Sequence, residues 1–194
     1  MNAPLHPHPR PAAVTPPADA MAVVDFWREA GPKSWFAKDP DFDRRFRDCF
    51  LTLHEAAARG DLADWAETPE GALALILLLD QFPRNAFRGT PRMYETDTMA
   101  WAIASAAVGA GHDRALDDAM AMFMYLPFGH AENEVDQDMS VSLVARLGPE
   151  VLPNAERHRS IIRRFGRFPH RNEILGRKTT RDERRFLEEG GFAG

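Results

Sequence analysis

Three short polar segments hold the residues best suited to chemistry, and the first runs from Asp80 to Gly89. Arg84 and Arg88 each carry a planar guanidinium that matches a carboxylate or a phosphate, and Asn85 lies between them. Asp80 follows a strongly apolar stretch, where a helix C-terminus disfavours negative charge unless a cation compensates. Arg84 and Arg88 are the nearest candidates for that cation. The segment therefore predicts either part of an anion site or an aspartate–arginine clamp that fixes a loop.

The second segment, residues 165–172, echoes the first. Both contain Phe-Pro, an Arg-Asn pair within three residues of it, and a glycine next to an arginine. Arg167, His170 and Asn172 are its candidate ligand-binding residues. His158 joins them, because helical spacing turns it toward the same apolar face as the isoleucines after it. We expect the two Phe-Pro loops to converge on one anion. The alternative is that Phe-Pro corners simply terminate helices.

The third segment, residues 125–133, supplies the candidate acid–base residues. His130 and Glu132 are predicted to be catalytic, with Asp136 beside them as a ligand-binding residue. At 100° per residue one helix face would hold Glu132, Val135, Asp136, Met139 and Leu143. Two carboxylates on an apolar face need partners, so salt-bridged structural carboxylates are the competing interpretation. The histidine and carboxylate spacing matches no established zinc pattern, so we predict no metal and no cofactor.

The elements that must position these segments are helices. Capping residues, prolines at first helical positions and terminal glycines recur along the chain, whereas strand alternation does not. They predict eight helices, at about 19–29, 40–60, 68–81, 97–109, 113–125, 132–147, 153–165 and 181–189. The third of these is apolar all round and is predicted to be the central buried helix. Eight helices with short connections indicate an all-α antiparallel array or bundle.

Composition limits the organisation of the chain and its partners. At 194 residues it suits one all-helical domain over residues 19–194, preceded by a proline-rich tail, residues 1–18, that we expect to be disordered. A net charge of -5 gives no general attraction to nucleic acid or to an anionic membrane. No stretch approaches the roughly 20 apolar residues that span a bilayer, and no signal peptide is recognisable. The single Cys49 excludes an internal disulfide, and we expect a cytoplasmic protein.

Taken together, the three segments resemble one bacterial family. The resemblance rests on Leu79-Asp80-Gln81-Phe82-Pro83-Arg84-Asn85, on Tyr125-Leu126-Pro127 through His130-Ala131-Glu132, and on Phe165-Gly166-Arg167-Phe168-Pro169-His170-Arg171-Asn172. The chain is similar to Domain of Unknown Function 924 from about residue 23 to residue 187. The resemblance implies a tetratricopeptide-like helical fold. It implies no activity and no catalytic residues.

Three hypotheses for function follow from these residues. The first is a cleft that binds, or acts on, a small anionic molecule. The second is an interaction module whose groove takes a peptide or a partner helix, which rests on analogy of fold. The third is a purely structural polar network. The spatial arrangement of the three segments discriminates between them, because only an anion site requires them to meet in one concavity.

Overall fold

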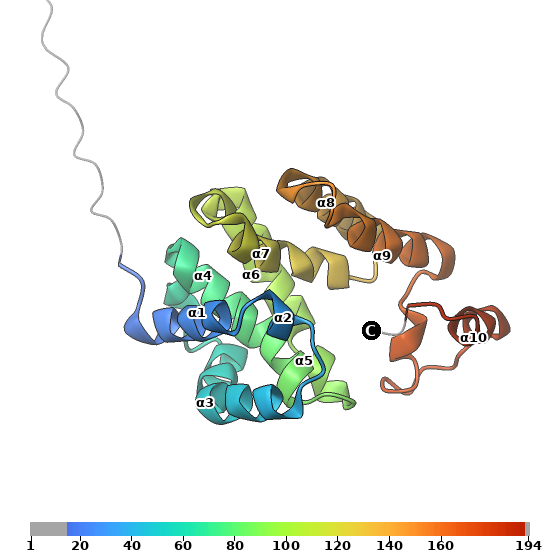
Figure 1. The fold of residues 1–194 in the computed structure, drawn as a ribbon, viewed down its shortest axis with the longest axis horizontal. Helices are drawn as coiled ribbons and strands as arrows, with labels where there is room; N and C mark the ends of the chain where they lie inside the picture. Colours follow the sequence, from blue (N-terminus) through green and yellow to red (C-terminus); the bar gives the residue numbers. More distant parts are fainter. Residues whose placement is uncertain (1–14, 193–194) are drawn as a thin grey trace, which may run out of the picture.

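The computed structural model describes residues 15–192, and within that range the regular structure is entirely helical (Figure 1). The α-helices are α1 (Ala18–Ala30), α2 (Pro32–Trp35), α3 (Pro40–Arg59), α4 (Pro69–Ile76), α5 (Phe82–Ala86), α6 (Asp97–Ala110), α7 (Asp118–His130), α8 (Glu134–Val144), α9 (Leu152–Phe165) and α10 (Arg181–Glu188). The shorter turns are η1 (Ala63–Glu67), η2 (Leu77–Gln81), η3 (Pro91–Tyr94), η4 (His112–Ala115), η5 (Ala145–Leu147) and η6 (Pro169–Arg171). The all-α prediction is confirmed, and each of the predicted helices is present.

Most helix starts follow the capping signals in the sequence. Asp39 accepts hydrogen bonds from the backbone N–H groups of Asp41 and Phe42 at the start of α3. Thr68 accepts from Gly71 N–H at the start of α4. Thr180 and Glu183 form the predicted capping box of α10. These local bonds satisfy N–H groups that a helix start leaves unpaired, which explains why sequence patterns located them.

The first helix begins differently from the prediction. It was expected to begin at about residue 19, but α1 starts at Ala18 and follows Pro17, with no side-chain cap. Asp19 lies in the first turn, where its charge favours the helix dipole instead. Residues 1–14 of the predicted tail lie outside the described residues. The first helix thus begins one residue before its predicted start.

The predicted third helix does not end at Gln81. It passes through η2, a π-helical turn, and continues as α5. Pro83 has no N–H to donate to the carbonyl of Leu79, and that carbonyl accepts from the Thr96 hydroxyl at 2.5 Å instead. The neighbouring Leu78 carbonyl is hydrogen-bonded to His54 Nδ1 at 2.8 Å. Side chains from other elements thus satisfy carbonyls next to the irregular turn, so the chain continues as a helix past a proline.

The predicted boundaries around residue 127 were also wrong. Pro127 lies inside α7, which runs on to His130, and Asn133 caps α8 in front of Glu134. Gln137 Nε2 holds the end of α7 by donating to the carbonyls of Gly129 and Ala131, both at 2.8 Å, and of Phe128 at 3.4 Å. Glu132 is therefore outside the helix that was expected to contain it.

The helix face predicted for residues 132–143 is likewise incorrect. Val135 is 78% exposed and Met139 is 47% exposed. The buried positions of α8 are Gln137, Ser140, Leu143 and Val144. Because α8 starts two residues later than predicted and packs on α7 and α9, a polar glutamine takes the inward position that periodicity had given to valine.

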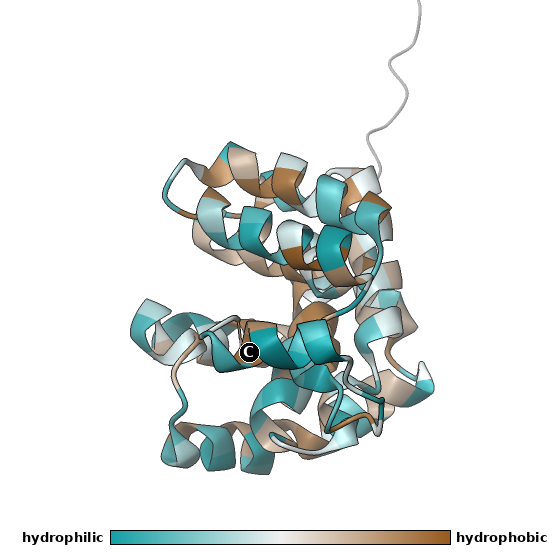
Figure 2. Ribbon diagram, turned by 90° about the vertical axis from the view of Figure 1, so that its right-hand side faces the viewer, coloured by the Kyte–Doolittle hydropathy of each residue, from teal (hydrophilic) through white to brown (hydrophobic). Residues whose placement is uncertain are grey.

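The hydrophobic core is centred on α4, as predicted. Residues 72–79 are at most 1% exposed, and α4 packs against α1, α6 and α7. Consecutive helices then pack in an array, α6 on α7, α7 on α8 and α8 on α9 (Figure 1). Hydrophobic residues gather inside the array and hydrophilic residues on its outer faces (Figure 2). A second, smaller cluster is formed by Ile161, Ile162 and Phe168 near the C-terminus. No described helix combines the length and apolar character needed to cross a membrane.

Candidate functional site

Residues of the second and third polar segments line one cleft of about 510 Å³. His130, Glu132 and Asp136 of the third segment line it, and so does Arg171 of the second. The wall is completed by aromatic and polar residues around the start of α6, namely Tyr94, Asp97, Thr98 and Trp101. The first segment lies directly behind this wall, because Asp80 contacts His130 and Arg84 contacts Asp97. The second and third segments thus share one concavity, and the first supports it from behind.

Arg84 is engaged with the scaffold of the cleft. It donates to both oxygens of Asp97, at 2.8 and 3.0 Å, and to the Asp80 carbonyl at 2.7 Å. Its Nη1 also lies 3.1 Å from Asp80 Oδ1. Burial acts to lower the pKa of Arg84, but the two carboxylates outweigh it and raise that pKa. This is the predicted aspartate–arginine clamp, and it leaves Arg84 with few donors for a ligand.

The other polar residues of the first segment point away from the cleft. Arg88, predicted to compensate Asp80, donates instead to Asp43 of α3, with both hydrogen bonds at 3.1 Å. Asn85 donates to the same carboxylate at 2.6 Å. Asp43 has no place in the sequence prediction, because the contact joins residues 42 and 45 positions apart. Asn85 and Arg88 thus connect α5 to α3.

His130 and Asp80 form a dyad at the back of the cleft. His130 Nδ1 lies 2.7 Å from Asp80 Oδ1, and Gln81 Nε2 donates to the other carboxylate oxygen at 2.6 Å. Burial alone would raise the pKa of Asp80, but Arg84 and His130 hold it below its ordinary value. Burial, with the charge of Arg84, lowers the pKa of His130. The pair is therefore an ionised aspartate and a neutral imidazole whose Nδ1 carries the proton.

Glu132, predicted to be an acid–base residue, is held by neighbouring donors. Its carboxylate accepts from Phe168 N–H at 2.7 Å and from both terminal nitrogens of Arg177. Burial acts to raise the pKa of Glu132, but these hydrogen bonds lower it below its ordinary value. The arrangement ties the start of α8 to the loop before η6. A carboxylate stabilised in its charged form in this way is a poor proton acceptor, so the geometry favours a positioning role.

Asp136 lies at the rim of the cleft as part of a helix cap. Its backbone N–H donates to Asn133 Oδ1 at 2.9 Å, and Asn133 Nδ2 donates back to its carboxylate at 2.5 Å. One carboxylate oxygen is thereby committed to the cap of α8. The remaining negative charge faces the same cleft as Arg171.

Arg171 is the unusual residue of the site. Only 7% of it is exposed, and its guanidinium stacks between the rings of Tyr94 and Phe168, at 4.7 and 4.6 Å. Its side chain makes no hydrogen bond with any described residue, and Asp97 approaches no closer than 3.6 Å. Its Nε is fully buried without an acceptor, as is Nε1 of Trp101 across the cleft wall. These two atoms are too deeply buried for a ligand to contact, but the terminal nitrogens of Arg171, which also form no hydrogen bond, belong to a side chain that lines the cleft and are donors for a molecule bound there.

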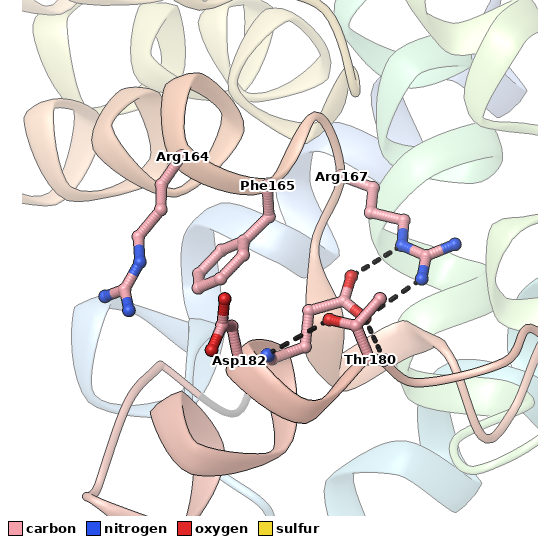
Figure 3. Close-up of a pocket in the computed structure, with 6 residues that line it drawn as sticks. Arg164, Phe165, Arg167, Thr180 and Asp182 are labelled. Carbon is pink, nitrogen blue, oxygen red and sulfur yellow. Dashed lines mark hydrogen bonds and ion pairs between the residues drawn. The ribbon is translucent and has the colours of Figure 1, made fainter.

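Arg167 does not reach the cleft, contrary to the expected convergence of the two Phe-Pro loops. It donates to Glu183 of α10 at 2.7 and 3.0 Å and to the Lys178 carbonyl at 2.7 Å (Figure 3). Its hydrogen bonds lower the pKa of Glu183 to about 2. Arg164 lies on the other side of Phe165 in the same view. Arg167 is thus a clamp for the C-terminal helix.

The remaining candidates of the second segment surround the smaller core cluster. His158 and His170 both pack on the rings of Phe168 and Phe192. Burial, followed by neighbouring positive charge, lowers the pKa of His158 to about 3 and that of His170 to about 4. Asn172 is fully buried and accepts from Arg177 Nε at 3.0 Å. Neither these histidines nor Asn172 lines the cleft, so they support it from behind.

The sequence interpretation missed Arg171, Asp97, Tyr94, Trp101 and Arg177. For Arg171 a signal existed, because the Arg-Asn pair of the first segment aligns with Arg171-Asn172 rather than with the glycine-adjacent Arg167. The others lie outside the three segments and enter the site only through packing. Among the residues described, no group of three or more His, Cys, Asp or Glu side chains is placed to hold a metal ion.

Comparison with known proteins gives a family and a fold. A family model described as bacterial protein of unknown function (DUF924) matches residues 23–191. The chain is also similar to a solved structure of a protein of unknown function, ATU0120, from Agrobacterium tumefaciens. The two sequences are 53% identical, the match covers 89% of this chain and 98% of that one, and the TM-score is 0.87. Comparison with curated proteins finds no match.

Proposed function

Because the chain belongs to DUF924, a family of bacterial proteins of unknown function, we propose a function from its cleft: it binds a small molecule that carries a carboxylate or a phosphate. Arg171 is the anchor for that anionic group. The observation that supports this proposal is the state of its guanidinium, which is buried, stacked between two rings and without a hydrogen-bond acceptor among the described residues.

The charges around Arg171 do not give the cleft a net positive charge that would attract anions in general. Three guanidinium groups, those of Arg84, Arg171 and Arg177, are accompanied by four carboxylates, those of Asp80, Asp97, Glu132 and Asp136. The arginines around the cleft therefore do not outnumber their acidic neighbours. The attraction for an anion therefore comes from the donors of Arg171, because Arg84 and Arg177 are committed to short hydrogen bonds and Arg171 is not. A planar, bidentate acceptor fits such a fork.

The experiment is a thermal-shift titration with inorganic phosphate, sulfate, glutarate and citrate. A ligand that binds only the folded state stabilises it by about 2.7 kcal/mol at a concentration of 100 times Kd. We expect at least one of these anions to raise the melting temperature of the wild type and to have no effect on Arg171→Met. Methionine keeps an apolar stem to pack between Tyr94 and Phe168 and removes the donors.

Arg167→Met is the matched control, because Arg167 lies four residues away and outside the cleft. It should respond to the anion as the wild type does. Equal responses of wild type and Arg171→Met would contradict the proposal. A large loss of stability in Arg171→Met without any ligand would instead favour the structural-network hypothesis, since it would mean that Arg171 compensates a buried carboxylate.

A further inference from the structure

The imidazole of His130 has one nitrogen fixed and one available. Asp80 Oδ1 holds Nδ1 at 2.7 Å, and Asp80 is itself fixed by Gln81 and Arg84. The opposite nitrogen, Nε2, forms no hydrogen bond with another described residue, and the side chain, 15% exposed, lines the anion cleft. An ionised aspartate can only accept, so it keeps the proton on Nδ1 and leaves a lone pair on Nε2. This is the geometry of a general base.

Two irregular helices place this pair. Asp80 lies in the π-helical turn η2, and His130 ends a helix that contains Pro127. π-helical turns such as η2 occur frequently at functional sites, and they cost regular hydrogen bonds. Here the cost is offset by Thr96 on the Leu79 carbonyl and by Gln137 on the last carbonyls of α7.

The proton that Nε2 accepts must come from a molecule in the cleft. Among the described residues that line it, the only aliphatic hydroxyl is that of Thr98, and there is no thiol or serine. The cleft is open at its rim, where Thr98 and Asn133 are exposed, so water reaches it. A dyad of this kind, without a side-chain nucleophile, acts by deprotonating water.

We propose that Asp80 and His130 form a general-base dyad that hydrolyses an ester or amide of the small anion held by Arg171. As water attacks the carbonyl carbon, the new C–O bond forms and its proton passes to Nε2. The tetrahedral intermediate then expels the alcohol or amine, which takes that proton from Nε2. One water is consumed, nothing is oxidised or reduced, and His130 returns to its neutral form. Asp80 stabilises the transient imidazolium. This inference rests on the proposed anion site.

The test uses mono-4-nitrophenyl glutarate, which has a carboxylate for Arg171 at one end and an activated ester at the other. We expect the wild type to release nitrophenol above the buffer rate and His130→Gln to lose on the order of 10²-fold in kcat. Arg171→Met should raise KM more than it lowers kcat. His112→Gln, in η4 and outside the cleft, is the control and should keep the wild-type rate.

A normal solvent deuterium isotope effect would distinguish general-base attack by water from direct attack by the imidazole.

Two readouts keep the inference separable from the anion site and from misfolding. Nitrogen-15 NMR of the histidines should show His130 as the Nδ1–H tautomer, with Asp80→Asn shifting it toward Nε2–H. Equal nitrophenol release by wild type and His130→Gln, or an Nε2–H tautomer in the wild type, would overturn the dyad. The thermal response to glutarate would remain in that case, so the anion site would survive. Loss of that response as well would remove both proposals.

Discussion

The two Phe-Pro segments share a sequence pattern but differ in what their polar groups contact. In the first, Arg84 donates to Asp80 and Asp97, and Asn85 donates to Asp43. In the second, Nε of Arg171 and Nδ2 of Asn172 are buried without acceptors. The same dipeptide therefore donates to carboxylates in one segment and has donors without acceptors in the other.

The surroundings of each segment explain the difference. The first lies in a continuous helical stretch inside the large core, where α3 and α6 each present an aspartate. The second lies in the short turn η6 beside a small aromatic cluster, where the neighbours are rings rather than carboxylates. A motif with arginine and asparagine indicates hydrogen-bonding capacity. Whether that capacity is available to a ligand depends on the acceptors that other elements supply.

The largest expected difference between the two segments appears when each arginine is removed. Arg84→Met leaves Asp80 and Asp97 buried without their main partner, and should lower the free energy of unfolding by about 3–5 kcal/mol. Arg171→Met removes no hydrogen bond and should lower it far less. Chemical denaturation of both variants measures this. Equal losses would mean that the two arginines play the same role.

Truncating a buried side chain next to the first segment should also lower the free energy of unfolding. Leu78 is fully buried next to the first segment, and Leu78→Ala should cost about 2–5 kcal/mol, as for other buried leucines. The same denaturation experiment applies. A loss below about 1 kcal/mol would contradict the central position of the helix that runs through η2.

Lowering the pH should destabilise the protein through two histidines, His170 in the second segment and His158 beside it. The pKa of His158 is about 3 and that of His170 about 4 in the folded protein, below the ordinary 6.5, because burial disfavours their charged forms. The unfolded chain then binds protons that the folded protein does not, so stability falls as the pH drops from about 6.5 toward 4. Each histidine contributes at most about 1.4 kcal/mol per pH unit. The melting temperature of the double variant His158→Gln, His170→Gln should depend less on pH over that window, and an unchanged slope would refute this assignment.

The smallest expected effect lies at the edge of the first segment. Arg88 is half exposed and shares Asp43 with Asn85, so Arg88→Met should cost less than about 1 kcal/mol. Denaturation alongside Arg84→Met gives the contrast directly. A cost comparable to that of Arg84→Met would show that the clamp extends through the whole segment rather than ending at Asn85.

Local signals in the sequence were sufficient for the helical class and for most helix starts. Caps such as Asp39, Thr68 and Thr180 act through hydrogen bonds within three residues, so their effect is written in neighbouring positions. The buried centre was predictable for a similar reason, since residues 72–79 are apolar on every side. Two of the three polar segments line one cleft, and the first contacts its wall from behind.

Tertiary structure decided which residues of those segments face the cleft. Thr96, from another element, satisfies the Leu79 carbonyl that Pro83 leaves without a donor, and Gln137 of the next helix satisfies the last carbonyls of α7 after Pro127. Arg84 is paired and Arg171 is open because Asp97 lies close to one and 3.6 Å from the other. Such contacts depend on how helices pack, and packing brings together residues whose spacing along the chain carries no signal. Which arginine is left without an acceptor was therefore a property of the fold.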